Sequence, residues 1–414
     1  MLTNKKKDMT PFDMQRPPVK QNPLLMPVVW SASWLMTRQF RLKIKKIGMK
    51  GLKPPYIVFS AHQGFSDYYI LPLALFPHRA NYVSDMEGFA AFGNGLYRAV
   101  GCIGKRRYVP DYSVIKNIKH AIKKKSPVVI FPESRHSNVG TTSYILDNLG
   151  KLSKSLGIPV VTVSIHGSYL ANPFWDEEHT RKVPMEAVIE CVCTKEKLKT
   201  STAEEIQRTI EEKLSYDEYR WQYENKISIG YKKNAEGLHK ALYKCRNCGC
   251  ETQMTSEDNR LFCKECNSSW QLSRYGRLEC GKESVHIPDW YEWQRTETQK
   301  ELETNGCDYS FDVRVEALPN EKGFVPLGSG RLQLDNNEFV LEIENESFVF
   351  PHRIRESVQT EYNYRGRGQC IVLSTRDCCY YIYCDDVNFS PTKLQFIGEY
   401  YYQKYSKEVH HERM

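Results

Sequence analysis

A histidine and an aspartate that stand five positions apart have the types and spacing to do acid–base chemistry. His62 follows the strand-like run Tyr56–Ala61, and Asp67 stands where a helix is expected to begin. A turn between them can fold the carboxylate back onto the imidazole, which fixes its tautomer and leaves the other nitrogen free to accept a proton. The spacing alone leaves an alternative open, in which His62 caps a loop and Asp67 caps a helix without any catalytic role.

Three further blocks follow this pair in order: Gly101–Arg107 (GCIGKRR), 128–137 (VVIFPESRHS) and 157–163 (GIPVVTV). Together with His62 and Asp67, they resemble the glycerolipid acyltransferase family, most closely the 1-acylglycerol-3-phosphate acyltransferases. The family patterns are H-x4-D, G-x-I-x-x-x-R, F-P-E-G-T-R-S and I-P-V-V-P-V. The resemblance covers about residues 25–220.

The resemblance implies an activity and a set of site residues. His62, oriented by Asp67, would deprotonate the sn-2 hydroxyl of lysophosphatidic acid, which attacks an acyl thioester directly and gives phosphatidic acid. The donor would be acyl-coenzyme A or acyl carrier protein, and glycerol 3-phosphate or another lysophospholipid stays open as the acceptor. Arg107, Glu133 and Arg135 would bind substrate, the arginines through the acceptor phosphate. Arg135 stands two residues after Glu133, whereas the family arginine commonly stands three after.

The elements that must position these residues form an α/β pattern over residues 55–235. Apolar strand-like runs alternate with amphipathic helical segments, which favours a mixed sheet covered by helices. Arg107 and Arg135 each follow a short apolar run, so we expect them at carboxyl ends of strands, where open α/β sheets keep their sites. The alternative for Lys105–Arg107 is a solvated basic turn. We also expect helices over 87–100, 112–125, 142–156 and 200–216.

Residues 1–54 combine an apolar stretch with a basic run. Leu24–Met36 contains Trp30 and Trp34, and seven Lys and Arg residues but no acidic residue follow between Arg38 and Lys53. This combination predicts an interfacial segment on an anionic membrane surface, too short to span it, and hence a peripheral or monotopic protein on the cytoplasmic face. A core helix with a solvated basic flank is the alternative.

Six of the 14 cysteines fall within residues 240–280. We expect no secretory signal peptide and therefore reduced thiols, which favours metal ligation over disulfides. Two Cys-x2-Cys pairs, Cys245 with Cys248 and Cys263 with Cys266, have the spacing of a zinc ribbon with a structural S4 site. Cys250 and Cys280 fall outside this spacing.

Residues 300–414 contain short alternating apolar runs, with a helix expected at Pro391–Tyr405. They predict a small β barrel or sandwich closed by a helix, with a layout that resembles pleckstrin-homology or GRAM-like modules. A net charge of +8 over 414 residues is mild. A non-catalytic, nucleic-acid-binding zinc-ribbon protein is the alternative of another class, but the acidic hairpin between Cys248 and Cys263 argues against nucleic acid as a partner.

Overall fold

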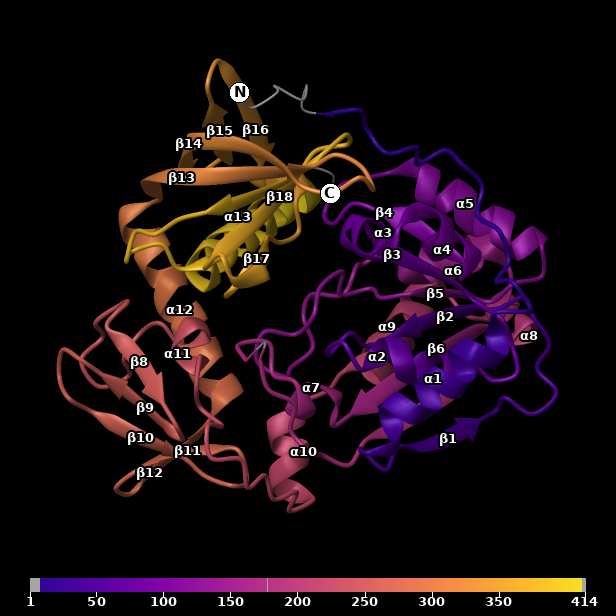
Figure 1. Ribbon diagram of the computed structural model, residues 1–414, viewed down its shortest axis with the longest axis horizontal. Helices are drawn as coiled ribbons and strands as arrows, with labels where there is room; N and C mark the ends of the chain where they lie inside the picture. Colours follow the sequence, from indigo (N-terminus) through magenta and orange to yellow (C-terminus); the bar gives the residue numbers. More distant parts are fainter. Residues whose placement is uncertain (1–7, 177, 412–414) are drawn as a thin grey trace, which may run out of the picture.

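The computed structural model of the protein describes residues 8–176 and 178–411. Three sheets follow one another along the chain, as Figure 1 shows: the acyltransferase-like region on the right, a cysteine-bearing sheet at the lower left and a β-rich region at the upper left. The expected order of a mixed sheet, a cysteine-bearing hairpin and a mainly-β region is therefore confirmed.

The first sheet has the strand order β1-β7-β6-β2-β5-β3-β4. Strands β2 to β6 are parallel to one another, and β1 and β7 run in the opposite direction. The strands are β1 Lys43–Ile47, β2 Ile57–Ser60, β3 Asn81–Asp85, β4 Cys102–Lys105, β5 Val128–Ile130, β6 Val160–His166 and β7 Glu186–Cys193. Strand β1 lies within the expected N-terminal segment, so part of residues 1–54 belongs to this sheet.

Helices cover both faces of this sheet because its central strands are apolar on both sides. Val58 packs with Ile70 and Leu71 of α2 on one face, while Ile57 and Phe59 pack with α5, α6 and α9 on the other. The helices are α1 Met26–Arg38, α2 Asp67–Leu75, α3 Met86–Phe92, α4 Asn94–Ala99, α5 Tyr112–Lys123, α6 Leu149–Leu156, α7 Ser168–Ala171, α8 Lys195–Thr200, α9 Ala203–Leu214, α10 Glu218–Glu224 and α11 Leu238–Ala241.

Two helix predictions in this region are wrong in extent. The segment expected as one helix over 87–100 is two helices, because Gly93 between them has φ of 79°, a left-handed conformation that breaks the helix. The helix expected from Thr142 begins only at Leu149. Residues ahead of it instead pair with the segment before α10, through the bridge Thr141–Asp217 and the hydrogen bond from Thr142 N to Tyr216 O.

The second sheet is an antiparallel meander in the order β12-β11-β10-β9-β8. Its strands are β8 Met254–Glu257, β9 Arg260–Cys263, β10 Ser269–Leu272, β11 Arg277–Cys280 and β12 Glu283–His286. Strands β8 and β9 are the hairpin expected between the two cysteine pairs. The 19-residue helix α12 (Ile287–Asn305), which we did not predict, then leads to the β-rich region.

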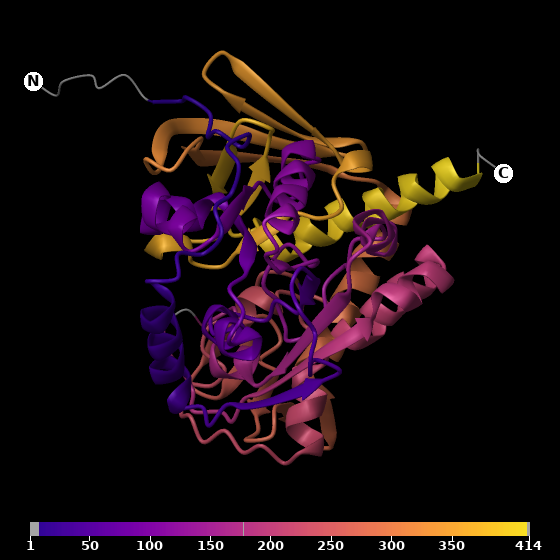
Figure 2. The same ribbon diagram turned by 90° about the vertical axis from the view of Figure 1, so that its right-hand side faces the viewer.

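The third sheet holds seven antiparallel strands in the order β16-β15-β14-β13-β19-β18-β17. They are β13 Asp308–Leu318, β14 Val325–Asp335, β15 Glu338–Ile343, β16 Glu346–Pro351, β17 Gln359–Glu361, β18 Cys370–Ser374 and β19 Cys379–Tyr383. The strands form one sheet, not the two of a sandwich. The expected terminal helix, α13 (Pro391–His411), lies across this sheet (Figure 2), and Leu394 and Ile397 pack into its core.

Candidate active site

His62 and Asp67 meet at the carboxyl end of β2. His62 lies two residues past the strand, and Asp67 opens α2, so the turn between them brings His62 Nδ1 within 3.3 Å of Asp67 Oδ2. The same oxygen accepts the amides of Gln63 (2.7 Å) and Gly64 (3.1 Å), and Oδ1 accepts the hydroxyl of Ser168 (2.7 Å). The carboxylate is fully buried and its orientation is fixed from four sides.

The charges of the pair follow from burial. The pKa of His62 is lowered to about 3, mainly by burial and in part by the Arg107 guanidinium, while Asp85 opposes the shift. Burial also raises the pKa of Asp67 to about 6, against the hydrogen bonds that it accepts. Near pH 7 the imidazole is thus neutral and the carboxylate mostly ionised. Nδ1–H therefore donates to Asp67, and Nε2 is left as the basic nitrogen.

Glu133 holds the backbone of the loop that carries His62. Its Oε1 accepts the amide of His62 (3.0 Å), while Oε2 accepts the amide of Ser143 (2.7 Å) and the hydroxyl of Tyr216 (3.1 Å). Burial raises its pKa to about 7. Because both oxygens bind protein groups, the contacts of Glu133 are those of a positioning residue, although the sequence predicted contact with substrate.

Arg107 lies two residues past β4 and is enclosed by carboxylates. Its Nη2 donates to Asp85 (2.5 Å) and lies 3.9 Å from Glu87, and its Nη1 lies 4.0 Å from Glu361 of the β-rich region. Burial lowers its pKa, but the three carboxylates outweigh burial and raise it. The expected place at a strand end is confirmed, while the guanidinium is paired with protein carboxylates.

The burial of the neighbouring Arg106 excludes the alternative of a solvated basic turn at Lys105–Arg107. Arg106 is 2% exposed and donates to the carbonyls of Pro319, Arg376 and Asp377, all in the β-rich region. The second block therefore joins the first sheet to the third.

Arg135 is also buried between two regions of the chain. Its Nε donates to Ser143 Oγ (3.2 Å), and its Nη2 lies 3.4 Å from Glu399 on α13. Its Nη1 is buried and has no hydrogen-bond partner among the described residues. Arg135 also lines a cavity of about 390 Å³ together with Tyr291 and Arg295 of α12.

Sequence reasoning missed His136, which lies beside His62. The two imidazoles have centroids 4.2 Å apart with 68° between their planes, and Phe131 stacks on His62 at 4.0 Å. An ungapped comparison with the third-block pattern could have singled His136 out, because F-P-E-G-T-R-S laid over 131–137 puts His136 at the family arginine. Ser134 then falls at the family glycine, and its φ of 58° is the left-handed conformation that glycine adopts freely.

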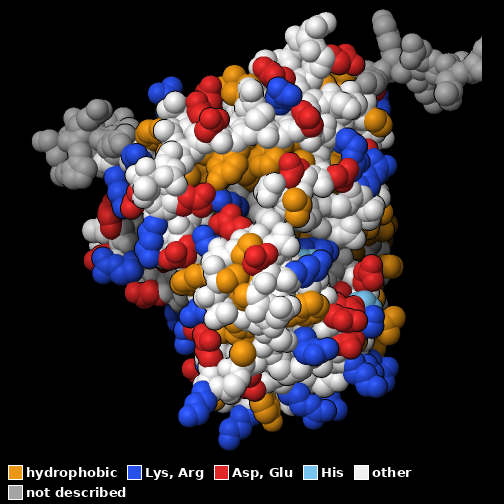
Figure 3. All heavy atoms as spheres, turned by 90° about the vertical axis from the view of Figure 1, so that its left-hand side faces the viewer, with side chains coloured by type: hydrophobic (Ala, Val, Ile, Leu, Met, Phe, Trp, Pro, Cys, Tyr) orange, Lys and Arg blue, Asp and Glu red, His pale blue; other side chains and the backbone are white. Residues whose placement is uncertain are grey.

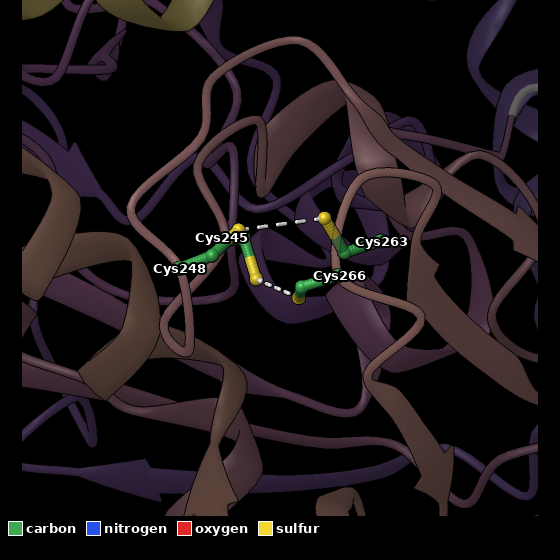
Figure 4. Close-up of side chains that lie close together, drawn as sticks. All are labelled: Cys245, Cys248, Cys263 and Cys266. Atoms are coloured by element: carbon green, nitrogen blue, oxygen red, sulfur yellow. Dashed lines mark hydrogen bonds between the residues drawn. The ribbon is translucent and has the colours of Figure 1, made fainter.

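The four cysteines predicted to bind zinc converge in the second region (Figure 4). Their Sγ atoms all lie within 4.8 Å of one another, with 3.7 Å between Cys245 and Cys266 and 3.8 Å between Cys248 and Cys263. A tetrahedral site with zinc–sulfur bonds of about 2.3 Å places its sulfurs roughly 3.8 Å apart, so this donor set fits zinc. All 14 cysteines are free thiols, and Cys250 and Cys280 lie outside the cluster.

Exposed apolar side chains lie on α1 and in the loop between His62 and Asp67. Helix α1 packs on α2, and Trp30 makes an edge-on contact with Phe76, the residue after α2, with centroids 4.9 Å apart. Phe65, between His62 and Asp67, is 66% exposed. The other exposed apolar side chains just before α1, on α1 and on α2 are Leu24, Val28, Trp34, Leu35, Met36 and Tyr69. Within the described residues, no helix has both the length and the apolar character that a membrane crossing requires.

One comparison with known proteins, that with family models, agrees with the resemblance. The family model described as Acyltransferase matches residues 41–166. Among solved structures, the chain is similar to the 1-acyl-sn-glycerophosphate (LPA) acyltransferase PlsC from Thermotoga maritima. The two share 17% identity over 45% of this chain and 79% of that chain, with a TM-score of 0.33. No curated protein matches. The match over residues 41–166 shows that the chain carries an acyltransferase domain.

Proposed function

We propose that the protein is a 1-acyl-sn-glycerol-3-phosphate acyltransferase that transfers an acyl chain from a thioester to lysophosphatidic acid. The pairing of a neutral, buried His62 with an ionised Asp67 carries this proposal. A neutral imidazole held by a carboxylate is suited to take the proton of an alcohol, and the reaction requires such a base.

The reaction needs two proton transfers, to His62 and from it, and one displacement at the thioester carbonyl. His62 Nε2 takes the proton of the sn-2 hydroxyl as its oxygen attacks the thioester carbonyl carbon. The carbon–sulfur bond then breaks, and the thiolate leaves with the proton from His62. Asp67 balances the imidazolium that forms between these steps, so no covalent intermediate on the protein is required.

The acceptor is a glycerolipid or lysophospholipid, and its phosphate is the feature that Arg107 and Arg135 would recognise. Arg135 has the stronger case, because its Nη1 is unpaired within the described part of the chain and its residue lines a cavity. Arg107 is already balanced by Asp85, Glu87 and Glu361. Glycerol 3-phosphate or another lysophospholipid remains the second candidate acceptor.

Access to the acceptor would come from a membrane surface. Phe65, which lies between His62 and Asp67, is exposed like the apolar side chains of α1, and a bilayer that touches both would lie next to the dyad. The basic residues of 38–53 would add attraction to anionic lipid.

The four-cysteine cluster would hold a structural zinc ion. Four thiolates fill a tetrahedral zinc site, so an ion there stabilises the ribbon and takes no part in acyl transfer. The ribbon does not favour the nucleic-acid alternative. On the face in Figure 3, which carries the ribbon and the β-rich region, Lys and Arg side chains are interspersed with Asp and Glu. Nucleic-acid surfaces concentrate basic residues instead.

The test is acyl transfer by the purified full chain, with acyl-coenzyme A and acyl carrier protein donors and a panel of lysolipid acceptors. We expect transfer to lysophosphatidic acid and its loss in His62→Ala, with unchanged thermal unfolding. His179→Ala is the matched control, because His179 also pairs with an aspartate, Asp176 at 3.0 Å, away from the dyad. Turnover retained by His62→Ala would overturn the dyad, and transfer only to another acceptor would overturn the substrate.

A further inference from the structure

The imidazole of His136 stands against the catalytic base and has an unused polar atom. Besides the ring contact with His62, it meets Phe65 at 5.1 Å and Phe174 at 6.2 Å between centroids. Its Nε2 is buried without a hydrogen-bond partner in the described chain. A buried imidazole nitrogen without a partner costs stability, so its presence next to reacting atoms calls for a functional reason.

Acyl transfer also needs a hydrogen-bond donor for the thioester carbonyl oxygen. Attack on a thioester puts negative charge on the carbonyl oxygen, and enzymes stabilise this oxyanion with hydrogen-bond donors. Backbone amides are the usual donors, but those of the first three residues of the loop that begins at His62 are occupied. The amide of His62 donates to Glu133, and those of Gln63 and Gly64 donate to Asp67.

The third-block turn places His136 beside His62, where these three amides offer no free donor. Ser134 N donates to Phe131 O and Ser134 adopts its left-handed conformation, while Ser137 N donates to His62 O. His136 is thereby held between two anchored residues and faces His62.

The charge state of His136 suits an oxyanion better than a phosphate. The pKa of His136 is held well below its ordinary value, mainly by burial and then by the neighbouring His62 and Arg107. A neutral imidazole donates one N–H and carries no charge. It can therefore stabilise the oxyanion without repelling the imidazolium that forms on His62, whereas a phosphate dianion requires a cation.

We propose that His136 is a second catalytic residue, whose imidazole N–H donates a hydrogen bond to the thioester carbonyl oxygen as it becomes an oxyanion. This rests on the proposed acyl transfer by His62. The proton stays on His136 throughout. When the carbon–sulfur bond breaks, the electron pair on the oxyanion re-forms the carbonyl, and the hydrogen bond weakens.

The kinetic test compares His136→Phe with His136→Gln in the full chain. Phenylalanine keeps the ring contacts and removes the donor, so kcat should fall about 10²- to 10³-fold, with KM for donor and acceptor within about threefold. Glutamine restores an N–H donor, so kcat of His136→Gln should be at least about tenfold higher than that of His136→Phe. Tyr68→Phe, which alters another ring near His62 (5.8 Å), should stay within about threefold of the parent.

Other kinetic outcomes overturn the proposal. A parental kcat in His136→Phe would do so, as would a loss confined to acceptor KM, which would indicate a phosphate contact. A collapse in Tyr68→Phe with His136→Phe unaffected would assign the donor to Tyr68.

A second measurement separates this proposal from the acyltransferase assignment. In His62→Ala, a bound acyl-coenzyme A carrying a ¹³C-labelled carbonyl should show its infrared stretch at lower frequency than in water-free solvent. Adding His136→Phe should abolish that shift. An unshifted carbonyl in His62→Ala would overturn the role of His136. Failure of the thioester to bind at all would instead count against the proposed function.

Discussion

Arg135 of the acyltransferase domain and Glu399 of α13 form a buried ion pair, with 3.4 Å between Nη2 and Oε1. Arg295 of α12 binds the same carboxylate, and Ser357 donates to it at 2.5 Å. Although burial raises the pKa of Glu399, the two arginines outweigh it and lower the pKa overall. A single carboxylate thus ties the third block to both long helices of the C-terminal half.

Replacement of Glu399 by glutamine should destabilise the whole chain. It leaves the buried Arg135 without a counter-charge and Arg295 with Glu292 alone, so the free energy of unfolding should fall by about 3 kcal/mol in denaturant titration. Asp385→Asn is the control, because it breaks the exposed pair with Arg314 and should cost at most about 1 kcal/mol. If the two variants had equal free energies of unfolding, the ion pair would not stabilise the contact between the domains.

The backbone at Ser134 gives a prediction in which strain and a hydrogen bond oppose each other. Ser134 has φ of 58°, and its Oγ accepts a hydrogen bond from Lys105 at 2.8 Å. Ser134→Ala loses the bond and keeps the strain, so it should cost about 1 kcal/mol. Ser134→Gly also loses the bond but relieves roughly 1 kcal/mol of strain, so its stability should stay near the parent. Thermal unfolding should therefore rank glycine above alanine, and the reverse order would contradict the strain.

Much of the site could be predicted because it depends on local sequence. The apolar runs marked the strands, and strand ends in a parallel sheet meet at one edge, which is where His62, Arg107 and Arg135 lie. The convergence of the four cysteines was predictable from their spacing, because two residues between ligands set the turn in each pair.

The rest depends on contacts between distant residues. Helix α12 escaped prediction because its buried face includes Gln294 and Thr298, which interrupt the apolar stripe. Gln294 donates to Ala241 O, and Thr298 shares a hydrogen bond with Tyr243. The local sequence pattern does not predict such distant partners. One of the three carboxylates around Arg107, that of Glu361, and the carboxylate of Glu399 on Arg135 likewise come from more than 250 positions later.

The titration of His62 should differ from that of an exposed histidine. With its pKa lowered to about 3, the imidazole should stay neutral, with the proton on Nδ1, from pH 8 down to pH 5. Nitrogen-15 NMR of the folded full chain reports this tautomer directly. Protonation of His62 near pH 6.5 would show that burial does not control it.

The pH dependence of kcat/KM should accordingly reflect Asp67. Its pKa is raised to about 6, so the carboxylate loses its proton, and activity should rise, as pH increases through about 6. The sign for stability is opposite. A raised carboxyl pKa stabilises the folded state at acid pH, and this contribution is lost as pH rises through the folded-state value.

Removal of one cysteine should release the metal from the ribbon. The wild-type chain should contain one zinc per molecule by mass spectrometry of the metal content. Cys263→Ser should lose it and lower the melting temperature, because metal binding contributes to folding of the ribbon. Cys250→Ser is the matched control from outside the cluster and should keep the zinc. One zinc per chain in Cys263→Ser would refute the ligand set.

The exposed face of α1 should govern binding to membranes. Trp34 and Leu35 are 58% and 63% exposed, so each should insert on contact with a bilayer. Replacement of either by serine removes roughly 1.5 kcal/mol of burial, which weakens binding to phosphatidylglycerol vesicles about tenfold. Phe92→Ser is the matched control, because Phe92 is 64% exposed but lies on α3. Cosedimentation at low and high salt measures both effects, and salt should weaken all variants equally through the basic residues of 38–53. A Phe92→Ser loss equal to that of Trp34→Ser would mean that α1 is not the membrane-facing surface.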